Sequence, residues 1–77
     1  MFEFMQKINN NINAILAEHA GDLEDQRIAM MAAAEDALSR QSIARSRNAS
    51  MSEQDALGVE VSLYMKALDR IDEQMFA

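Results

Sequence analysis

The most constraining feature of this 77-residue sequence is an apolar stripe near its C-terminus. Large apolar residues recur there at alternating intervals of four and three positions: Leu57, Val61, Tyr64, Leu68, Ile71 and Met75. An α-helix places residues with this spacing on one face, whereas a half-buried strand needs alternation at every second position. The spacing therefore predicts a helix over about residues 53–76 that packs against another helix in the manner of a coiled coil.

A second stripe with the same spacing lies near the N-terminus and predicts a helix over about residues 3–20. Its apolar members are Met5, Ile8, Ile12 and Ile15. Asparagines at positions 9, 10, 11 and 13 lower the intrinsic helix propensity of this segment, so we expect it to depend on packing. Gly21 suits a left-handed C-cap and Asp22 suits the N-cap of a following helix. The junction is predicted to be a tight corner or a sharp kink.

The middle of the chain predicts a helix over about residues 23–47 with two apolar faces. One face carries Met30, Ala34, Ala37, Leu38 and Gln41, and the other carries Ile28, Ala32, Ser39 and Ile43. Two apolar faces indicate two neighbours, and the alanines of the centre permit close approach of a packed helix. After a break at residues 48–50, either Ser50 with Glu53 or Ser52 with Asp55 forms a capping box for the last helix.

The composition supports an all-α fold for a single domain over residues 1–77, because the chain has no proline, two glycines and no cysteine. Two arrangements remain open. The helices form either a three-helix bundle or a helical hairpin in which the first two helices are one kinked rod. A core of this size leaves only a few kcal/mol of stability, and no disulfide is available to add to it. We therefore expect oligomerisation or a partner to complete the coiled-coil-like seams.

Several classes of ligand are disfavoured by charge and hydropathy. The net charge of -6 argues against nucleic acid and anionic lipid, which need clustered lysine and arginine. No apolar run approaches the roughly 20 residues of a membrane span. The N-terminal residues lack the basic and apolar regions of a secretory signal, so we expect a cytoplasmic protein.

Catalysis and metal binding are also disfavoured. His19 is the single histidine, and a zinc site needs three or four converging ligands. The serines of the predicted break are far in sequence from that histidine, and no glycine-rich phosphate loop is present. We therefore predict that the chain is not an enzyme and binds no metal or cofactor.

The sequence favours a small helical protein–protein interaction module, such as an adaptor, chaperone-like or inhibitor subunit. The predicted interface with a partner or a second copy consists of Met5, Ile8, Ile12, Ile15, Leu57, Val61, Tyr64, Leu68, Ile71 and Met75. The basic cluster at the end of the middle helix is either a solvated helix terminus or a polar contact for an acidic partner, and it consists of Arg40, Arg45 and Arg47. The alternative is a self-assembling structural subunit, as a homodimer or larger bundle, and an enzyme is the remote third hypothesis.

The overall profile is similar to that of two groups of small proteins. Short length, acidity, a capped break at residues 50–54 and a closing amphipathic helix resemble the helical co-chaperones of bacterial type III secretion needles. Short, acidic, cysteine-free chains are also typical of phage-encoded inhibitors of host proteins. Neither resemblance rests on a specific motif, so it implies no role for a particular residue.

Overall fold

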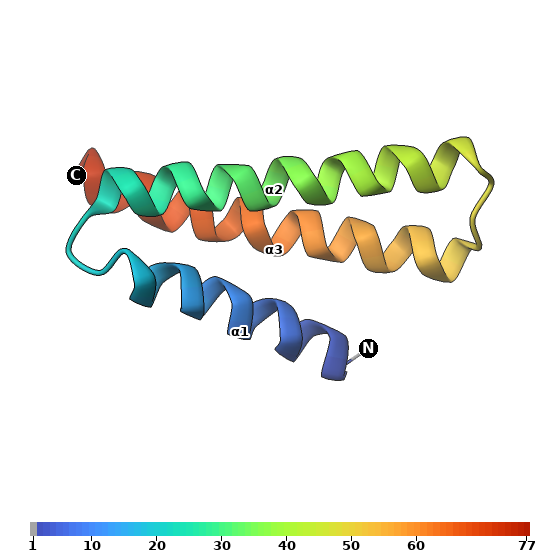
Figure 1. The fold of residues 1–77 in the computed structure, drawn as a ribbon, viewed down its shortest axis with the longest axis horizontal. Helices are drawn as coiled ribbons and strands as arrows, with labels where there is room; N and C mark the ends of the chain where they lie inside the picture. The colour runs from blue at the N-terminus through green and yellow to red at the C-terminus, as the bar shows by residue number, and fades with distance from the viewer. Residues whose placement is uncertain (1) are drawn as a thin grey trace.

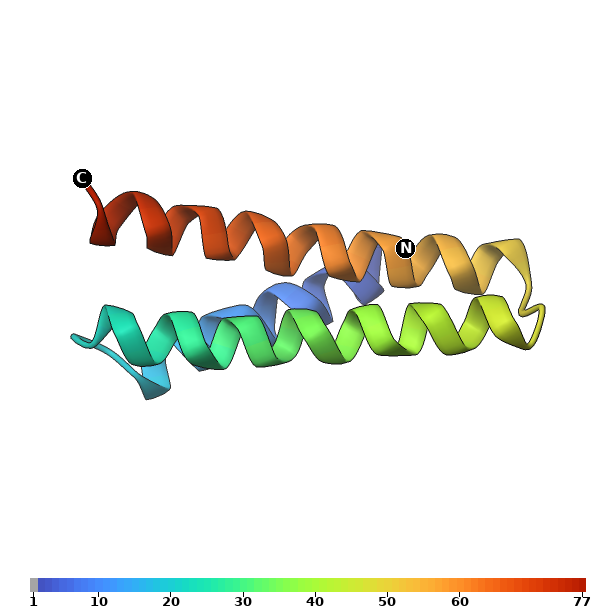
Figure 2. The same ribbon diagram turned by 90° about the horizontal axis from the view of Figure 1, so that it is seen from above.

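The computed structural model describes residues 2–77, which form three α-helices joined by two short connections (Figure 1). The helices are α1 (Phe2–Glu18), α2 (Leu23–Ser46) and α3 (Met51–Met75). The second and third form a long antiparallel hairpin, and α1 folds back along it between the two (Figure 2). These residues contain no strand, which confirms the all-α prediction. Because α1 packs on the hairpin of its own chain, the arrangement is the three-helix bundle rather than the kinked rod.

Capping side chains set where α2 and α3 begin. Oδ1 of Asp22 accepts a hydrogen bond of 3.1 Å from the amide of Asp25, and Oγ of Ser50 accepts one of 3.1 Å from the amide of Glu53. Ser50 is therefore the cap that begins α3, and the alternative cap at Ser52 was wrong. Consequently α3 starts two residues before its predicted beginning at about 53.

The corner between α1 and α2 depends on a glycine. Gly21 has a φ of 85°, in the left-handed region that a residue with a side chain enters only with strain. The amide of Asp22 donates to the carbonyl of His19 at 3.0 Å, and this bond closes the turn. The sequence extended the first helix to about residue 20, but α1 ends at Glu18 because the chain already turns at His19.

The apolar stripes predicted from sequence meet in one core. Met30, in the N-terminal half of α2, is fully buried, and small residues that follow it on the same face let α3 approach closely. The rest of the buried cluster comes from all three helices: Ile8, Ile12, Ala34, Ala37, Tyr64, Ala67, Leu68 and Ile71. Ion pairs between Arg27 and Asp72 and between Arg47 and Glu53 lie towards opposite ends of the hairpin. Both pairs join residues that the antiparallel register of the hairpin places side by side.

The molecule is elongated, with principal extents of 41, 23 and 19 Å. Its radius of gyration is 13.3 Å, against about 11.5 Å expected for a compact domain of this length. Figures 1 and 2 show the cause: the hairpin extends well past the N-terminal end of α1. Helix α1 therefore covers only part of the hairpin, and much of the surface of α2 and α3 has no neighbour among residues 2–77.

Candidate interaction surface

Half of the residues predicted to form an interface lie inside the chain's own core. Ile8, Ile12, Tyr64, Leu68 and Ile71 are all buried, with at most 8% of their surface exposed. Four others are half-buried: Ile15, Val61 and Met75 pack against this core, and Leu57 lies closer to the start of α3. Met5 is 36% exposed. The stripes are thus already paired with one another, and contact between them and a second molecule stays a prediction.

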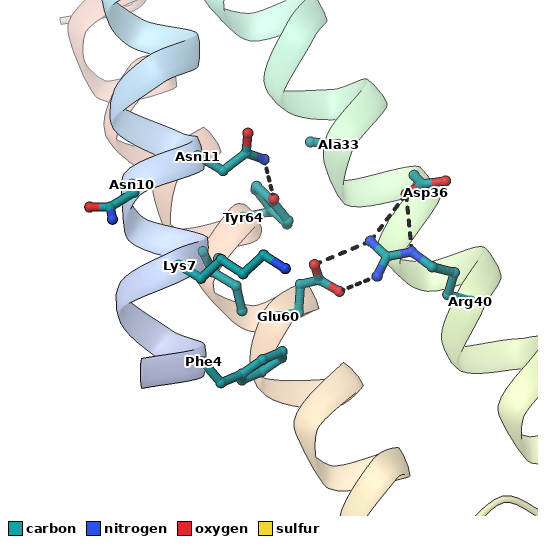
Figure 3. A pocket seen from close by; sticks show the side chains of 10 residues that line it. Phe4, Lys7, Asn10, Asn11, Ala33, Asp36, Arg40, Glu60 and Tyr64 are labelled. Atoms are coloured by element: carbon teal, nitrogen blue, oxygen red, sulfur yellow. Dashed lines mark hydrogen bonds and ion pairs between the residues drawn. The ribbon is translucent and has the colours of Figure 1, made fainter. Parts of the chain in front are cut away.

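Of the three predicted arginines, Arg40 has the most elaborate surroundings (Figure 3). Its Nη1 lies 2.8 Å from Oε1 of Glu60, its Nη2 donates to Oε2 at 3.1 Å, and its Nε donates to Asp36. Glu60 is only 7% exposed, and its Oε1 has no well-aligned hydrogen bond, so the nearby guanidinium is what compensates its charge. The hydrogen bond with Glu60 raises the pKa of Arg40, although partial burial acts in the opposite direction.

The other two arginines lie near the far end of the hairpin. Arg47 pairs with Glu53 at 2.7 Å, and both side chains are about half exposed or more. Arg45 is exposed beside a shallow hollow that Gln41 and Gly58 also line. The three predicted arginines therefore have different surroundings. Arg40 pairs with a buried acid, Arg47 belongs to an exposed pair and Arg45 is exposed to solvent. Contact of these arginines with an acidic partner stays a prediction.

A hollow of about 620 Å³ opens between α1 and the hairpin, beside the Arg40–Glu60 pair. Lys7 extends towards Glu60 and Tyr64 there (Figure 3), and Nδ2 of Asn11 donates to the Tyr64 hydroxyl at 2.6 Å. The charged residues that line the hollow are two bases, Lys7 and Arg40, and two acids, Asp36 and Glu60. Because these charges cancel and most are already paired, the hollow offers no excess charge for an ionic ligand.

The most distinctive surface is on α2, on the side that faces away from α3. Met30, Ala34 and Ala37 are at most 3% exposed on the inner side of this helix. On the opposite side, Ile28 and Ile43 are each 59% exposed, and on the adjoining flank Leu38 is 48% exposed and Met31 is 37% exposed. Together with Ala32, these four large residues define the outer face of α2.

The outer face is almost free of charge. Between its two isoleucines lie Ser39, Ser42 and one acid, Glu35, which sits close to the middle of the face. Asp36 and Arg40 lie at its border towards α1 and pair with each other at 3.1 Å. A solvated helix normally carries charged and polar residues opposite its buried stripe, and a helix that is apolar all round is normally buried. The outer face therefore lacks the neighbour that its composition calls for.

Sequence reasoning found this face in part. It placed Ile28, Ala32 and Ile43 on a second apolar face of the middle helix and expected a second neighbour there. It placed Leu38 on the same face as Met30, Ala34 and Ala37, but this side chain is 48% exposed whereas those three are buried. It also omitted the outer face from the interface residues, because the two regular stripes were the stronger periodic signal.

Comparison with known proteins adds no assignment: no protein-family model, curated protein or solved structure matches this chain significantly. Within residues 2–77, no three His, Cys, Asp or Glu side chains are grouped so that they could hold a metal ion. No helix of this described region combines the length and apolar character needed to cross a membrane.

Proposed function

We propose that this chain is a small helical interaction protein that binds another protein through the outer face of α2. The observation that carries the proposal is the exposure of four large apolar side chains on one helix face, with a single acid among them. Ile28 and Ile43 are fifteen positions apart, so the face is about 22 Å long. This length suits the side of one partner helix, as in other helix-in-groove recognition.

The size of the face sets the strength of binding. The exposed fractions of Ile28, Met31, Leu38 and Ile43 amount to about two whole side chains. Burying them contributes about 3–6 kcal/mol, at 1.5–3 kcal/mol for each large apolar side chain. Association costs about 4–15 kcal/mol in lost freedom, so the partner must supply apolar surface of its own. We therefore expect a partner with a complementary apolar helix face.

Glu35 favours a different protein over a second copy of this one. It lies midway between Ile28 and Ile43, and a two-fold dimer centred on the face would bring the two Glu35 carboxylates together. Like charges placed opposite each other at an interface are destabilising. A partner with a lysine or arginine opposite this residue would gain an ion pair instead. Self-assembly through the outer face is thus the second candidate.

A pair of double variants tests the proposal. Ile28→Ser/Ile43→Ser removes the ends of the outer face, and Met51→Ser/Phe76→Ser removes two residues of similar or greater exposure elsewhere. We expect the wild-type chain and the Met51→Ser/Phe76→Ser control to enrich the same partner protein. The Ile28→Ser/Ile43→Ser variant should fail to enrich it. Calorimetry with that purified protein should show a loss of about 2–3 kcal/mol, which is a loss of roughly 30-fold to 140-fold in affinity. Equal affinity for all three chains would reject the proposal.

Charge reversal distinguishes the two candidates. Glu35→Lys should weaken binding to a different protein that carries a cation opposite this position. If the chain instead pairs with itself through the outer face, a mixture of the Glu35→Lys and wild-type chains should form a heterodimer that is tighter than either homodimer. Light scattering of the separate and mixed chains measures this difference.

A further inference from the structure

The attachment of α1 to the hairpin is the least complete contact in the fold. Only Ile8 and Ile12 of this helix are buried, and Phe4, Ile15 and Leu16 pack partly against the core. No ion pair within residues 2–77 joins α1 to the other helices. Hollows of about 620 and 370 Å³ lie on its two sides. A helix with few buried contacts and low intrinsic propensity opens more readily than the rest of its domain.

The connection to α2 is short and depends on one conformation. Gly21 has a φ of 85°, and a Cβ built on it would meet no atom within 4 Å. Gln26, which is 9% exposed, donates from Nε2 to the carbonyls of Leu16 and His19 at 3.3 and 3.2 Å. In a straight helix through this corner, backbone amides would occupy those carbonyls instead. Gly21 and Gln26 therefore hold the bend.

We propose that the groove of the α2–α3 hairpin that α1 fills is also the binding site for the α1 of a second copy. In the exchanged dimer, residues 19–22 become helical, α1 and α2 form one rod, and each α1 docks in the groove of the other copy. The α1 of a second copy fits this groove, because its Ile8 and Ile12 would meet the same core residues in the exchanged dimer as in the monomer.

Concentration decides between the two forms. A four-residue connection holds α1 near its own groove at a high effective concentration, in the millimolar range for short linkers. The wild-type chain should therefore be monomeric at micromolar concentration and exchange α1 at millimolar concentration. Short hinges favour such exchange once the bend is destabilised. This inference does not rest on the outer face of α2, and the Ile28→Ser/Ile43→Ser variant should exchange as the wild type does.

Two hinge variants and one control test the proposal. Gly21→Ala disfavours the left-handed turn and favours the continuous helix, and it should lower the concentration for dimerisation at least tenfold. Gln26→Ala removes both hydrogen bonds that hold the bend and should act in the same direction. Gly58→Ala is the control, since it also replaces a glycine by alanine but lies inside α3, where the new Cβ would be 3.4 Å from the Gln41 side chain.

The two lysines of the chain report which copy supplies α1. Lys7 lies on α1, and Lys66 lies on α3 beside Asn9 and Asn13 of α1. Unlabelled and ¹⁵N-labelled chains are mixed, allowed to equilibrate and treated with an amine-reactive cross-linker. Exchange predicts Lys7–Lys66 cross-links that contain one labelled and one unlabelled peptide, most abundant in the two hinge variants.

Each outcome decides the proposal. Mixed cross-links in the hinge variants, but not in Gly58→Ala at the same concentration, support it. A monomer at millimolar concentration, or a dimer whose Lys7–Lys66 cross-links all lie within one copy, overturns it. Circular dichroism shows whether Gly21→Ala keeps its helices. If it does not, the same Lys7–Lys66 cross-links are measured in Gln26→Ala and in the wild type at millimolar concentration, and these two chains then test the proposal.

Discussion

Replacing Arg40 with alanine removes the positive charge that faces the buried carboxylate of Glu60. The Glu60 side chain is 10% exposed and the Arg40 side chain is 46% exposed. Breaking a fully buried ion pair costs about 3–5 kcal/mol, whereas an exposed pair contributes about 0.2–1 kcal/mol. With one partner buried and the other half in water, we expect a loss of about 1.5–3 kcal/mol. A single core of this size supplies only about 3–5 kcal/mol in total, so the loss is large.

Urea unfolding followed by circular dichroism measures the effect, and two companion variants assign its cause. Arg47→Ala breaks a pair of 2.7 Å in which both side chains are substantially exposed, and it should cost less than about 1 kcal/mol. Adding Glu60→Gln to Arg40→Ala removes the uncompensated charge and should recover about half of the loss. Equal losses for Arg40→Ala and Arg47→Ala, or no recovery in the double variant, would refute this reasoning.

Three further variants test the packing, the polar contacts and the caps by the same unfolding measurement. Ile71→Ala empties a core position that is 3% exposed and should cost about 2–4 kcal/mol, whereas Ile43→Ala on the outer face should change stability by less than about 0.5 kcal/mol. Tyr64→Phe removes the acceptor of the 2.6 Å bond from Asn11 and should cost about 0.5–1.5 kcal/mol. Ser50→Ala removes the cap of α3 and should cost about 1 kcal/mol, and no change would show that this cap is unimportant.

The helices and their pairing were largely readable from the sequence, because period and capping are local properties. The C-terminal stripe that includes Ile71 and the N-terminal stripe that includes Ile12 both face the core. Asp22 and Ser50 cap the helices that follow them. These features depend on neighbours within one or two helical turns, which a single sequence displays directly.

The environment of α2 was less predictable, because it depends on which of its sides the other two helices cover. Both faces of α2 are apolar. The inner face packs against α3 because its alanines allow α3 to approach closely. Leu38 shares the predicted face of Met30 and Ala37 but is 48% exposed, because α1 packs on the other side of α2, where Asp36 and Arg40 lie. The burial of Glu60 depends on Arg40 of another helix, twenty positions away in sequence. Such contacts follow from three-dimensional packing and leave no periodic signal.

Hydroxyl-radical footprinting tests the central claim, that the outer face of α2 binds another protein, before that protein is known. Met31 lies on the outer face and is 37% exposed, and Met51 lies away from it and is 70% exposed. Both are methionines, whose oxidation depends on access to solvent. The chain is labelled as a purified protein and again in an extract of the cells that produce it. We predict that oxidation of Met31 is several times slower in the extract while that of Met51 is unchanged. Equal protection factors for the two methionines would contradict the account.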